Sequence, residues 1–342
     1  MNSEIQALGK WCSEHVANFV DPVAHVDVAS AGRSNVTMIL TDAVGTRFVV
    51  RKPPPVTALP TAHDVFREGR IMAALEGTAV PVPTILAMTE DESVIGVPFV
   101  VMNHVEGHVV DAIGDVDVLS SDDRLCVGRD LAVALAALHS VVPHDVGLGD
   151  LAKTENFVGR QLSRFHRQWR DLGDDDLTTA FMDCHATLVD KQPQDSSRVC
   201  IVHGDYRIGN VIVANGRVQA VLDWELTTLG HSLADLAYLL NNWVTADEAE
   251  HGPITSPIAA GGFGTRDDII ATYQDHVAWP VEQSDVNYFR ALAYWRLASI
   301  RSGVVDRLEG HDDRLRQEQA QQSRQSLPLL IGSAQRLLGD DQ

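Results

Sequence analysis

The chain has 342 residues, 45% of them hydrophobic, which is long enough for one large bilobal domain or two ordinary ones. A formal net charge of −20 argues against nucleic acid or an anionic membrane as the main partner. The four cysteines are widely spaced without a C-x-x-C pair, which indicates neither a zinc site nor a disulfide framework. Because the first residues do not read as a secretory signal and no apolar run approaches a membrane span, we expect a cytoplasmic protein.

The first hundred residues predict a helix followed by short strands. Apolar residues recur at helical spacing over 3–19, and small residues at 29–34 interrupt two β-rich runs within 27–40. The next strand, 46–52, ends in Arg51 and Lys52 before three prolines. Side chains alternate along a strand, so only one of these cations can point into a given cleft. The strand pattern itself leaves both Arg51 and Lys52 as candidates.

A helix is predicted over 62–77, with Glu68 on its apolar stripe. Ile71, Met72 and Leu75 follow Glu68 at i+3, i+4 and i+7, so they share its face. A glutamate on such a stripe points inward, although a glutamate near a helix N-terminus can also simply complement the helix dipole. Strands are then predicted at 84–88 and 98–102.

The middle of the chain predicts helices at 121–139, 150–170 and 175–191. Four arginines recur at helical spacing within this part: Arg160, Arg164, Arg167 and Arg170. They form either a solvated face or a contact surface for an acidic substrate. Further helices are predicted at 266–277, 284–305 and 311–338.

The stretch 199–225 carries the most information, because it predicts a strand, a polar loop and a hairpin in succession. A two-residue turn at Asn215-Gly216 places Asn210 opposite Val221. Asp223 then lies two residues further, roughly 7 Å along the strand. An amide oxygen and a carboxylate at one end of a hairpin suit a hard cation such as Mg²⁺. The alternative is that these residues only make turns and caps.

The motifs of this stretch resemble the catalytic core of the protein-kinase-like fold. His203-Gly204-Asp205 is followed by Asn210 at the kinase spacing, and Asp223-Trp224-Glu225 stands where D-F-G would stand. The H-G-D and D-W-E forms resemble the aminoglycoside phosphotransferase and choline kinase branch, which phosphorylates small molecules. A narrower resemblance is to the kinase-like domains related to those fused to acyl-CoA dehydrogenases, which are implicated in phosphorylating hydroxyacyl compounds. It also rests on Arg51-Lys52-Pro53, Arg67-Glu68 and Pro81-Val82-Pro83.

The resemblance implies an α+β, bilobal protein-kinase-like fold. Residues 1–103 would form a small nucleotide-binding lobe with an antiparallel sheet. Residues 104–342 would form a larger, mainly helical lobe for catalysis and substrate binding. The segment Gly230–Tyr238 resembles the family's G-x-x-x-x-D-L-A motif, and we expect Asp235 to be a buried acceptor for backbone N–H groups of the catalytic loop.

The resemblance also implies a role for each site residue. Asp205 would accept the proton of the acceptor hydroxyl, and Arg207 would balance charge on the transferring phosphoryl group. Mg²⁺ would bind Asn210 and Asp223. ATP would be bound by the remaining candidates, which are Ser34 in the phosphate loop, Arg51 or Lys52 paired with Glu68, and the backbone from Asn103 to Val105. Related small-molecule kinases often have an apolar triplet followed by a basic residue in this strand, which slightly favours Arg51, with Lys52 as a near-equal candidate.

These roles predict an ATP- and Mg²⁺-dependent kinase acting on a hydroxyl group of a small molecule, with a hydroxyacyl compound as one acceptor. Two alternatives within the resemblance are an aminoglycoside-type kinase and a nucleotide-binding module without transferase activity, which Arg51 at the lysine position would support. A metal-dependent hydrolase using the same carboxylates is a third. We expect a small-molecule partner, with neither nucleic acid nor membrane.

Overall fold

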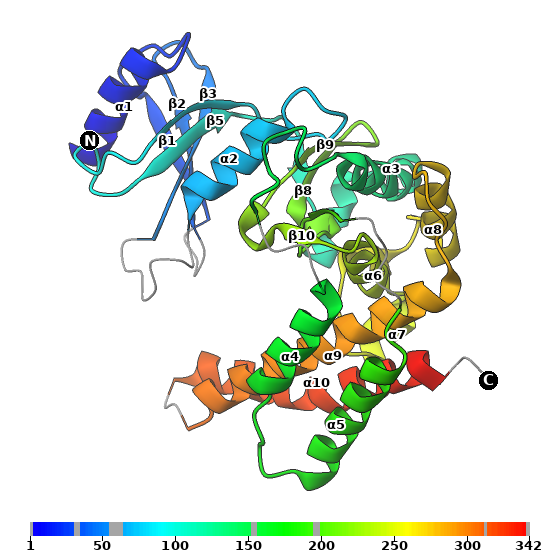
Figure 1. The fold of residues 1–342 in the computed structure, drawn as a ribbon. Coiled ribbons are helices and arrows are strands. Elements are labelled where there is room, and N and C mark those ends of the chain that lie inside the picture. Colours follow the sequence, from blue (N-terminus) through cyan, green and yellow to red (C-terminus); the bar gives the residue numbers. More distant parts are fainter. Residues whose placement is uncertain are drawn as a thin grey trace.

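The computed structural model describes residues 3–30, 35–54, 64–151, 156–193, 199–310 and 313–339. They form a small lobe built on a sheet and a larger lobe built mainly of helices, so the structure is α+β (Figure 1). None of the helices in these ranges is both long and apolar enough to cross a membrane.

The small lobe is a five-stranded antiparallel sheet with the order β1-β2-β3-β5-β4. Its strands are β1 (His25–Ser30), β2 (Val36–Thr41), β3 (Arg47–Lys52), β4 (Ile85–Thr89) and β5 (Phe99–Asn103). We place the boundary between the lobes after β5, because the chain then leaves this sheet.

One helix packs on each face of this sheet. The helix α1 (Ser3–His15) buries Leu8 and Cys12 against side chains that include Phe48 and Val50. The helix α2 (Val65–Leu75) buries Ile71 and Met72 with Val100 and Met102, from the opposite face. Since strand side chains alternate, neighbouring residues of β3 contact different helices.

The large lobe contains the remaining helices, whose apolar faces form one core. They are α3 (Ser121–Ser140), α4 (Phe157–Gln168), α5 (Asp175–Asp190), α6 (Leu233–Asn241), α7 (Ala246–His251), α8 (Arg266–Asp275), α9 (Gln283–Leu308) and α10 (Arg314–Gly339). At the centre of the α4, α5 and α9 layer, Trp169 stacks on Phe181 with ring centroids 4.0 Å apart, and Phe181 stacks on Trp295 at 4.8 Å. Trp295 is fully buried, so it packs the core.

Short strands position the loops of the large lobe. The strands β8 (Val211–Ala214) and β9 (Arg217–Val221) form the predicted hairpin, and β6 (His108–Val109) adds to its edge. A second pair consists of β7 (Cys200–Val202) and β10 (Thr228–Gly230). The loop that follows β7 and the segment that follows β9 lie side by side, because His203 and the carbonyl of Leu222 are hydrogen-bonded at 2.8 Å.

The predicted hairpin register is wrong by one residue at its open end. The register shifts between Ile212 and Val213, where a β-bulge places Gln219 as an extra residue on β9. Val211, and not Asn210, therefore lies opposite Val221. Asn210 ends a short 3-10 turn, Ile208–Asn210, although its carbonyl still accepts the N–H of Leu222 at 2.8 Å.

Candidate active site

Arg51 and Lys52 point to opposite faces of the sheet, which follows from strand alternation. The Arg51 Nε lies 2.9 Å from Oε2 of Glu68 on α2, and its Nη2 donates to Oδ1 of Asp223 at 3.0 Å. Lys52 instead forms an ion pair with Glu4 on α1. Arg51 is therefore the cation that faces the cleft between the lobes, whereas Lys52 ties α1 to the sheet.

Glu68 is buried, and its surroundings hold it in place. The Asn35 Nδ2 donates to its Oε1 at 2.5 Å, while Arg51 pairs with the other oxygen. Burial raises the pKa of Glu68 from an ordinary value near 4.5 to about 7; the charge of Arg51 opposes this rise, and those of Asp223 and Glu225 add to it. This carboxyl group therefore titrates close to neutral pH.

The loop after β7 brings Asp205 and Asn210 together. The Asn210 Nδ2 donates to the backbone oxygen of Asp205 at 2.7 Å and to its Oδ2 at 2.8 Å. Both hydrogen bonds use the amide nitrogen of Asn210, so its amide oxygen is the atom left to act as a ligand. The five-residue spacing from Asp205 to Asn210 thus closes a loop in which the amide of Asn210 holds the carboxylate of Asp205 in place.

Two further side chains lie beside the Asp205 carboxylate. The Arg207 Nε is 3.9 Å from Oδ1 of Asp205, and its Nη1 donates to Oδ1 of Asp111 at 2.6 Å. Tyr238 of α6 also interacts with Asp205: burial raises the pKa of this phenol, and the charge of Asp205 raises it further. Tyr238 therefore remains a neutral hydrogen-bond donor.

Asp235, at the start of α6, braces the same loop as predicted. Its carboxylate accepts the backbone N–H of His203 at 2.6 Å and that of Gly204 at 2.8 Å, and His139 lies 3.3 Å away. His203 donates from Nε2 to the carbonyl of Leu222 at 2.8 Å, because its Nδ1 accepts the N–H of Asp205. His203 and Asp235 therefore both have a structural role, which is to hold this loop in place.

Gly204 is required by this loop geometry. Its φ is +91°, and a Cβ at this position would lie 2.8 Å from the carbonyl oxygen of Leu226. The glycine of the H-G-D motif therefore allows the loop to pass close to the segment after β9.

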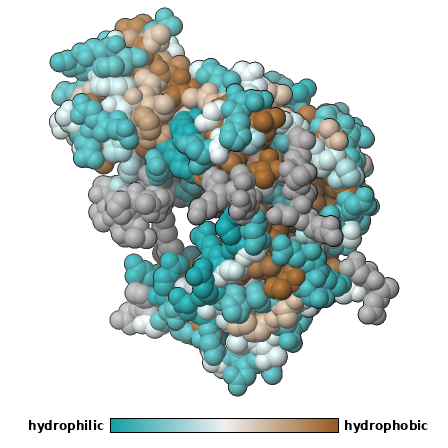
Figure 2. Space-filling model, in the orientation of Figure 1, coloured by the Kyte–Doolittle hydropathy of each residue, from teal (hydrophilic) through white to brown (hydrophobic). Residues whose placement is uncertain are grey.

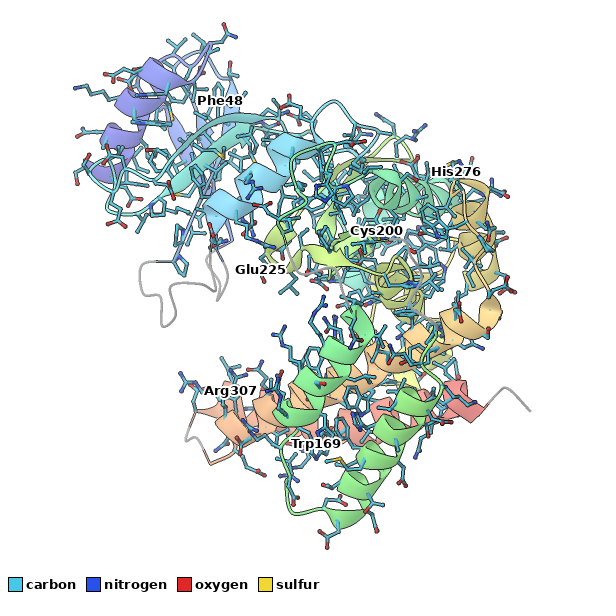
Figure 3. The ribbon with its side chains drawn as sticks, viewed as in Figure 1. Phe48, Trp169, Cys200, Glu225, His276 and Arg307 are labelled. Carbon is cyan, nitrogen blue, oxygen red and sulfur yellow. The ribbon has the colours of Figure 1, made fainter. Side chains whose placement is uncertain are left out.

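Asp223 projects from the turn after β9 in a left-handed conformation, with φ 63°. Trp224 is fully buried behind it and donates from Nε1 to the carbonyl of Val221 at 3.0 Å. Arg67 of α2 donates to the carbonyls of Glu225 and Thr227, so α2 and this segment are linked directly. Glu225, labelled in Figure 3, lies on the side of the large lobe nearest α2.

A cavity of about 270 Å³ opens between the lobes. Its walls are mostly apolar, and Arg51, Glu68 and Asp223 line it as well. The predicted hinge residues Asn103 and Val105 are also among its lining residues. The backbone N–H of Asn103 is already used, because it donates to the carbonyl of Thr84 at 3.1 Å. The hinge N–H groups still able to contact a ligand therefore belong to the residues after Asn103.

The structure brings most of the predicted site residues to this region. Asp205, Arg207 and Asn210 share one loop, and Asp223 contacts Arg51 across the lobes. Lys52 is directed away from them, and Ser34 lies outside the described residues.

The oxygen atoms of Asp223 and Asn210 fit Mg²⁺, which prefers hard ligands and is often bound by only one or two carboxylates together with substrate phosphates. Within the described ranges, no group of three or more histidine, cysteine, aspartate or glutamate side chains could hold a metal ion. This sparse donor set suits a metal that arrives with a phosphate ligand.

Sequence reasoning missed three side chains that support the site: Asn35, Tyr238 and Arg296. Tyr238 follows Asp235 by three residues, so helical periodicity could have placed it on the same face of α6. Arg296 lies on α9 with its Nη2 3.4 Å from the carbonyl of Gly204, and no local pattern connects residues so distant in sequence. Asn35 ends the predicted phosphate loop, and no local pattern indicates its contact with Glu68.

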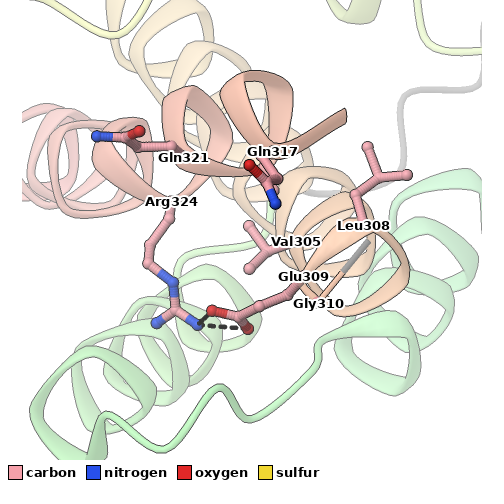
Figure 4. Close-up of a pocket in the computed structure, with 8 residues that line it drawn as sticks. Val305, Leu308, Glu309, Gly310, Gln317, Gln321 and Arg324 are labelled. Atoms are coloured by element: carbon pink, nitrogen blue, oxygen red, sulfur yellow. Dashed lines mark hydrogen bonds and ion pairs between the residues drawn. The ribbon is translucent and has the colours of Figure 1, made fainter. Parts of the chain in front are cut away.

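A separate pocket lies where α9 ends and α10 begins (Figure 4). The Arg324 Nη2 donates to both carboxylate oxygens of Glu309 at 2.8 Å. Glu309 and Arg324 are the charged residues that line this pocket, and they already pair with each other. We therefore assign no chemistry to this pocket.

The small sheet lobe, the cleft and the two segments that carry the H-G-D and D-W-E motifs together constitute a protein-kinase-like fold, as the sequence predicted. The chain belongs to the phosphotransferase enzyme family, because the sequence model of that family matches residues 25–255. It is therefore a member of a family of small-molecule phosphotransferases.

The narrower resemblance is also confirmed. The acyl-CoA dehydrogenase family member 11 of Rattus norvegicus is 30% identical over 318 residues, which cover 89% of this chain and 39% of the relative. This chain thus spans about two fifths of the length of that relative.

Solved structures agree with the fold. A candidate aminoglycoside phosphotransferase of Ralstonia eutropha is 30% identical, with a TM-score of 0.79 over 96% of this chain and 98% of that one. The macrolide 2′-phosphotransferase of Brachybacterium faecium is 16% identical, with a TM-score of 0.60 over 93% of this chain and 97% of that one. The second comparison supports the fold alone.

Proposed function

We propose that this protein is an ATP- and Mg²⁺-dependent kinase that phosphorylates a hydroxyl group on a small anionic acceptor, with a hydroxyacyl compound as the first candidate. The observation that carries the proposal is the joint placement of two segments. Asn210 holds Asp205 by its carboxylate, and Asp223 of the next segment contacts Arg51 of the small lobe.

The cavity between the lobes supports nucleotide binding. Its apolar walls suit a purine base, and Arg51, which lines the same cavity, supplies a cation suited to phosphate oxygens. Glu68 fixes the guanidinium of Arg51, so the cation is positioned before a ligand arrives. Mg²⁺ held by Asp223 and Asn210 would supply charge neutralisation on the phosphates.

Asp205 is the residue proposed to handle the acceptor proton. Its carboxylate accepts a hydrogen bond from the acceptor hydroxyl and takes the proton as the new oxygen–phosphorus bond forms. The bond from the γ-phosphorus to the β–γ bridging oxygen breaks, and ADP leaves. Arg207, 3.9 Å from Asp205, would lie close enough to balance negative charge on the transferring group.

Arginines beside the catalytic loop support an anionic acceptor. Arg164 of α4 and Arg296 of α9 lie 5.2 Å and 5.6 Å from the centroid of the Phe165 ring, and Arg296 also contacts Gly204. The surface over α4 is strongly hydrophilic (Figure 2). In a chain of net charge −20, cations gathered beside Asp205 favour an acceptor that carries a carboxylate or phosphate.

One observation favours a second candidate, a nucleotide-binding module without transferase activity. Arg51 stands where kinases have lysine, and it contacts the same carboxylate that is proposed to bind the metal. If that contact persists with nucleotide bound, Asp223 would be a poor ligand and transfer would be slow.

The decisive experiment measures phosphate transfer from γ-labelled ATP with Mg²⁺ to hydroxyacyl-CoA, aminoglycoside, choline and sugar panels. We expect labelled product from a hydroxyacyl acceptor, and a loss of about 10²–10⁴-fold in Asp205→Asn with ATP affinity nearly unchanged. Asp275→Asn, an exposed change on α8, is the matched control and should retain activity. ATP binding without product from any acceptor would favour the second candidate, and no ATP binding would refute both.

A further inference from the structure

A second polar pocket lies on the large lobe, between α7, α8, α9 and α10. Its volume is about 240 Å³, and it shares no lining residue with the cleft between the lobes. None of the residues that line it takes part in the proposed phosphoryl transfer, so its chemistry is a separate question.

The carboxylate of this pocket is already occupied. Glu248 accepts from Nη1 and Nη2 of Arg266 at 2.9 Å each, and one of its oxygens also accepts the backbone N–H of Thr245 at 2.8 Å. This bidentate pair neutralises Arg266. Glu248 therefore has little capacity left to neutralise a second cation.

A second guanidinium, that of Arg290 on α9, lines the same pocket. Its Nε donates to Oδ1 of Asn241 at 3.0 Å, and the described residues place no carboxylate within ion-pair distance of it. Burial lowers the pKa of Arg290, and the positive charge of Arg266 also lowers it, while Tyr294 and the charge of Glu248 partly oppose this shift. The neighbouring Tyr294 is buried with a raised pKa, so it is a neutral hydroxyl and cannot balance this charge.

A third arginine, Arg336, reaches the pocket from the last turns of α10. Its Nη2 donates to the hydroxyl oxygen of Ser333 at 2.9 Å, and it too has no carboxylate at ion-pair distance in the described part of the chain. The pocket thus combines several N–H and O–H donors with one carboxylate that is already paired. The positive charge of Arg290, which is partly buried and has no carboxylate at ion-pair distance among the described residues, is costly unless an anion completes it.

We infer that this pocket is a binding site for a phosphate group, carried by inorganic phosphate or by a small phosphate monoester. Arginine forks match phosphate oxygens with paired hydrogen bonds, and a dianion balances the two guanidiniums that lack a carboxylate. The apolar walls formed by Val244 and Ile254 can cover a short carbon skeleton.

The test is equilibrium dialysis of the full chain against radiolabelled inorganic phosphate at constant ionic strength. It is performed in an Arg51→Gln background, so that the cation of the cleft between the lobes does not contribute. Arg336→Gln is the main variant because this side chain is exposed, and Arg314→Gln, another exposed arginine of α10, is the matched control. Arg290→Lys keeps the charge but removes the paired geometry.

We expect binding that approaches one phosphate per chain, weakened about tenfold by Arg336→Gln and unchanged by Arg314→Gln. Arg290→Lys should also weaken it, and a urea midpoint close to that of the parent shows that the variant is folded. The absence of phosphate binding at millimolar concentration would overturn the inference. Equal binding by the Arg336→Gln and Arg314→Gln variants would overturn it as well. Neither result depends on whether the protein transfers phosphate.

Discussion

Replacing Glu68 by glutamine should change how stability depends on pH. Because burial raises the pKa of Glu68 from about 4.5 to about 7, the folded protein binds this proton more tightly than the unfolded chain does. The stabilisation that results is complete below pH 4.5 and is lost as pH rises through 7. Glutamine cannot ionise, so the unfolding free energy of the Glu68→Gln variant does not fall with pH for this reason.

The size of the effect follows from the same values. A pKa difference of about 2.5 corresponds to roughly 3 kcal/mol of unfolding free energy. Wild-type protein should therefore lose up to roughly 3 kcal/mol relative to Glu68→Gln between pH 4.5 and pH 8. At pH 8 the ionised carboxylate of Glu68 still positions Arg51 through their ion pair.

Urea unfolding at pH 5 and pH 8 measures this difference directly. Glu76→Gln, an exposed change at the end of the same helix, is the control and should follow the wild-type curve. Parallel pH profiles for wild type and Glu68→Gln would refute the reasoning, because they would mean that the carboxyl group is not desolvated. Reduced ATP affinity in Glu68→Gln at pH 8 would separately support its role in positioning Arg51.

Three further outcomes are expected. Arg51→Gln should weaken ATP binding by at least about tenfold, whereas Lys52→Gln should leave it unchanged in the same titration, since Lys52 contacts α1; equal losses would contradict the assignment. Asp235→Asn should lower the unfolding free energy by about 3 kcal/mol in urea, because two backbone N–H groups lose a charged acceptor; an unchanged midpoint would show that the loop does not need this brace. Tyr238→Phe should reduce kcat roughly tenfold with ATP affinity intact, the effect of one hydrogen bond to a charged group, about 1.5 kcal/mol; an unchanged kcat would exclude Tyr238 as a positioning residue for Asp205.

The two-segment core could be predicted because its signals are local. The spacing from Asp205 to Asn210, the Asn215-Gly216 turn and the position of Asp223 all depend on residues close in sequence. The register error arose from a bulge at Gln219, where no residue type in the sequence indicates a bulge. Bulges depend on how a strand bends against its neighbours, so tertiary packing decides them.

The choice between Arg51 and Lys52 shows the limit of periodicity. Alternation establishes that the two side chains diverge, but it does not tell which face of the sheet each helix covers. The structure resolves this through α2, which supplies Glu68, and α1, which supplies Glu4. Contacts between distant elements, such as Arg296 with Gly204, are likewise invisible to local patterns.

Arginine in place of lysine at position 51 does not by itself argue for an inactive site. Its Nε contacts Glu68 and its Nη2 contacts Asp223, and in the described residues its Nη1 contacts no acceptor. A guanidinium has five donors in a fixed fork, whereas a lysine ammonium is a single point charge. Arg51 can therefore keep its brace on Glu68 while it offers donors to a phosphate. If the phosphate replaces Asp223 as its partner, the same event frees that carboxylate to act as a ligand.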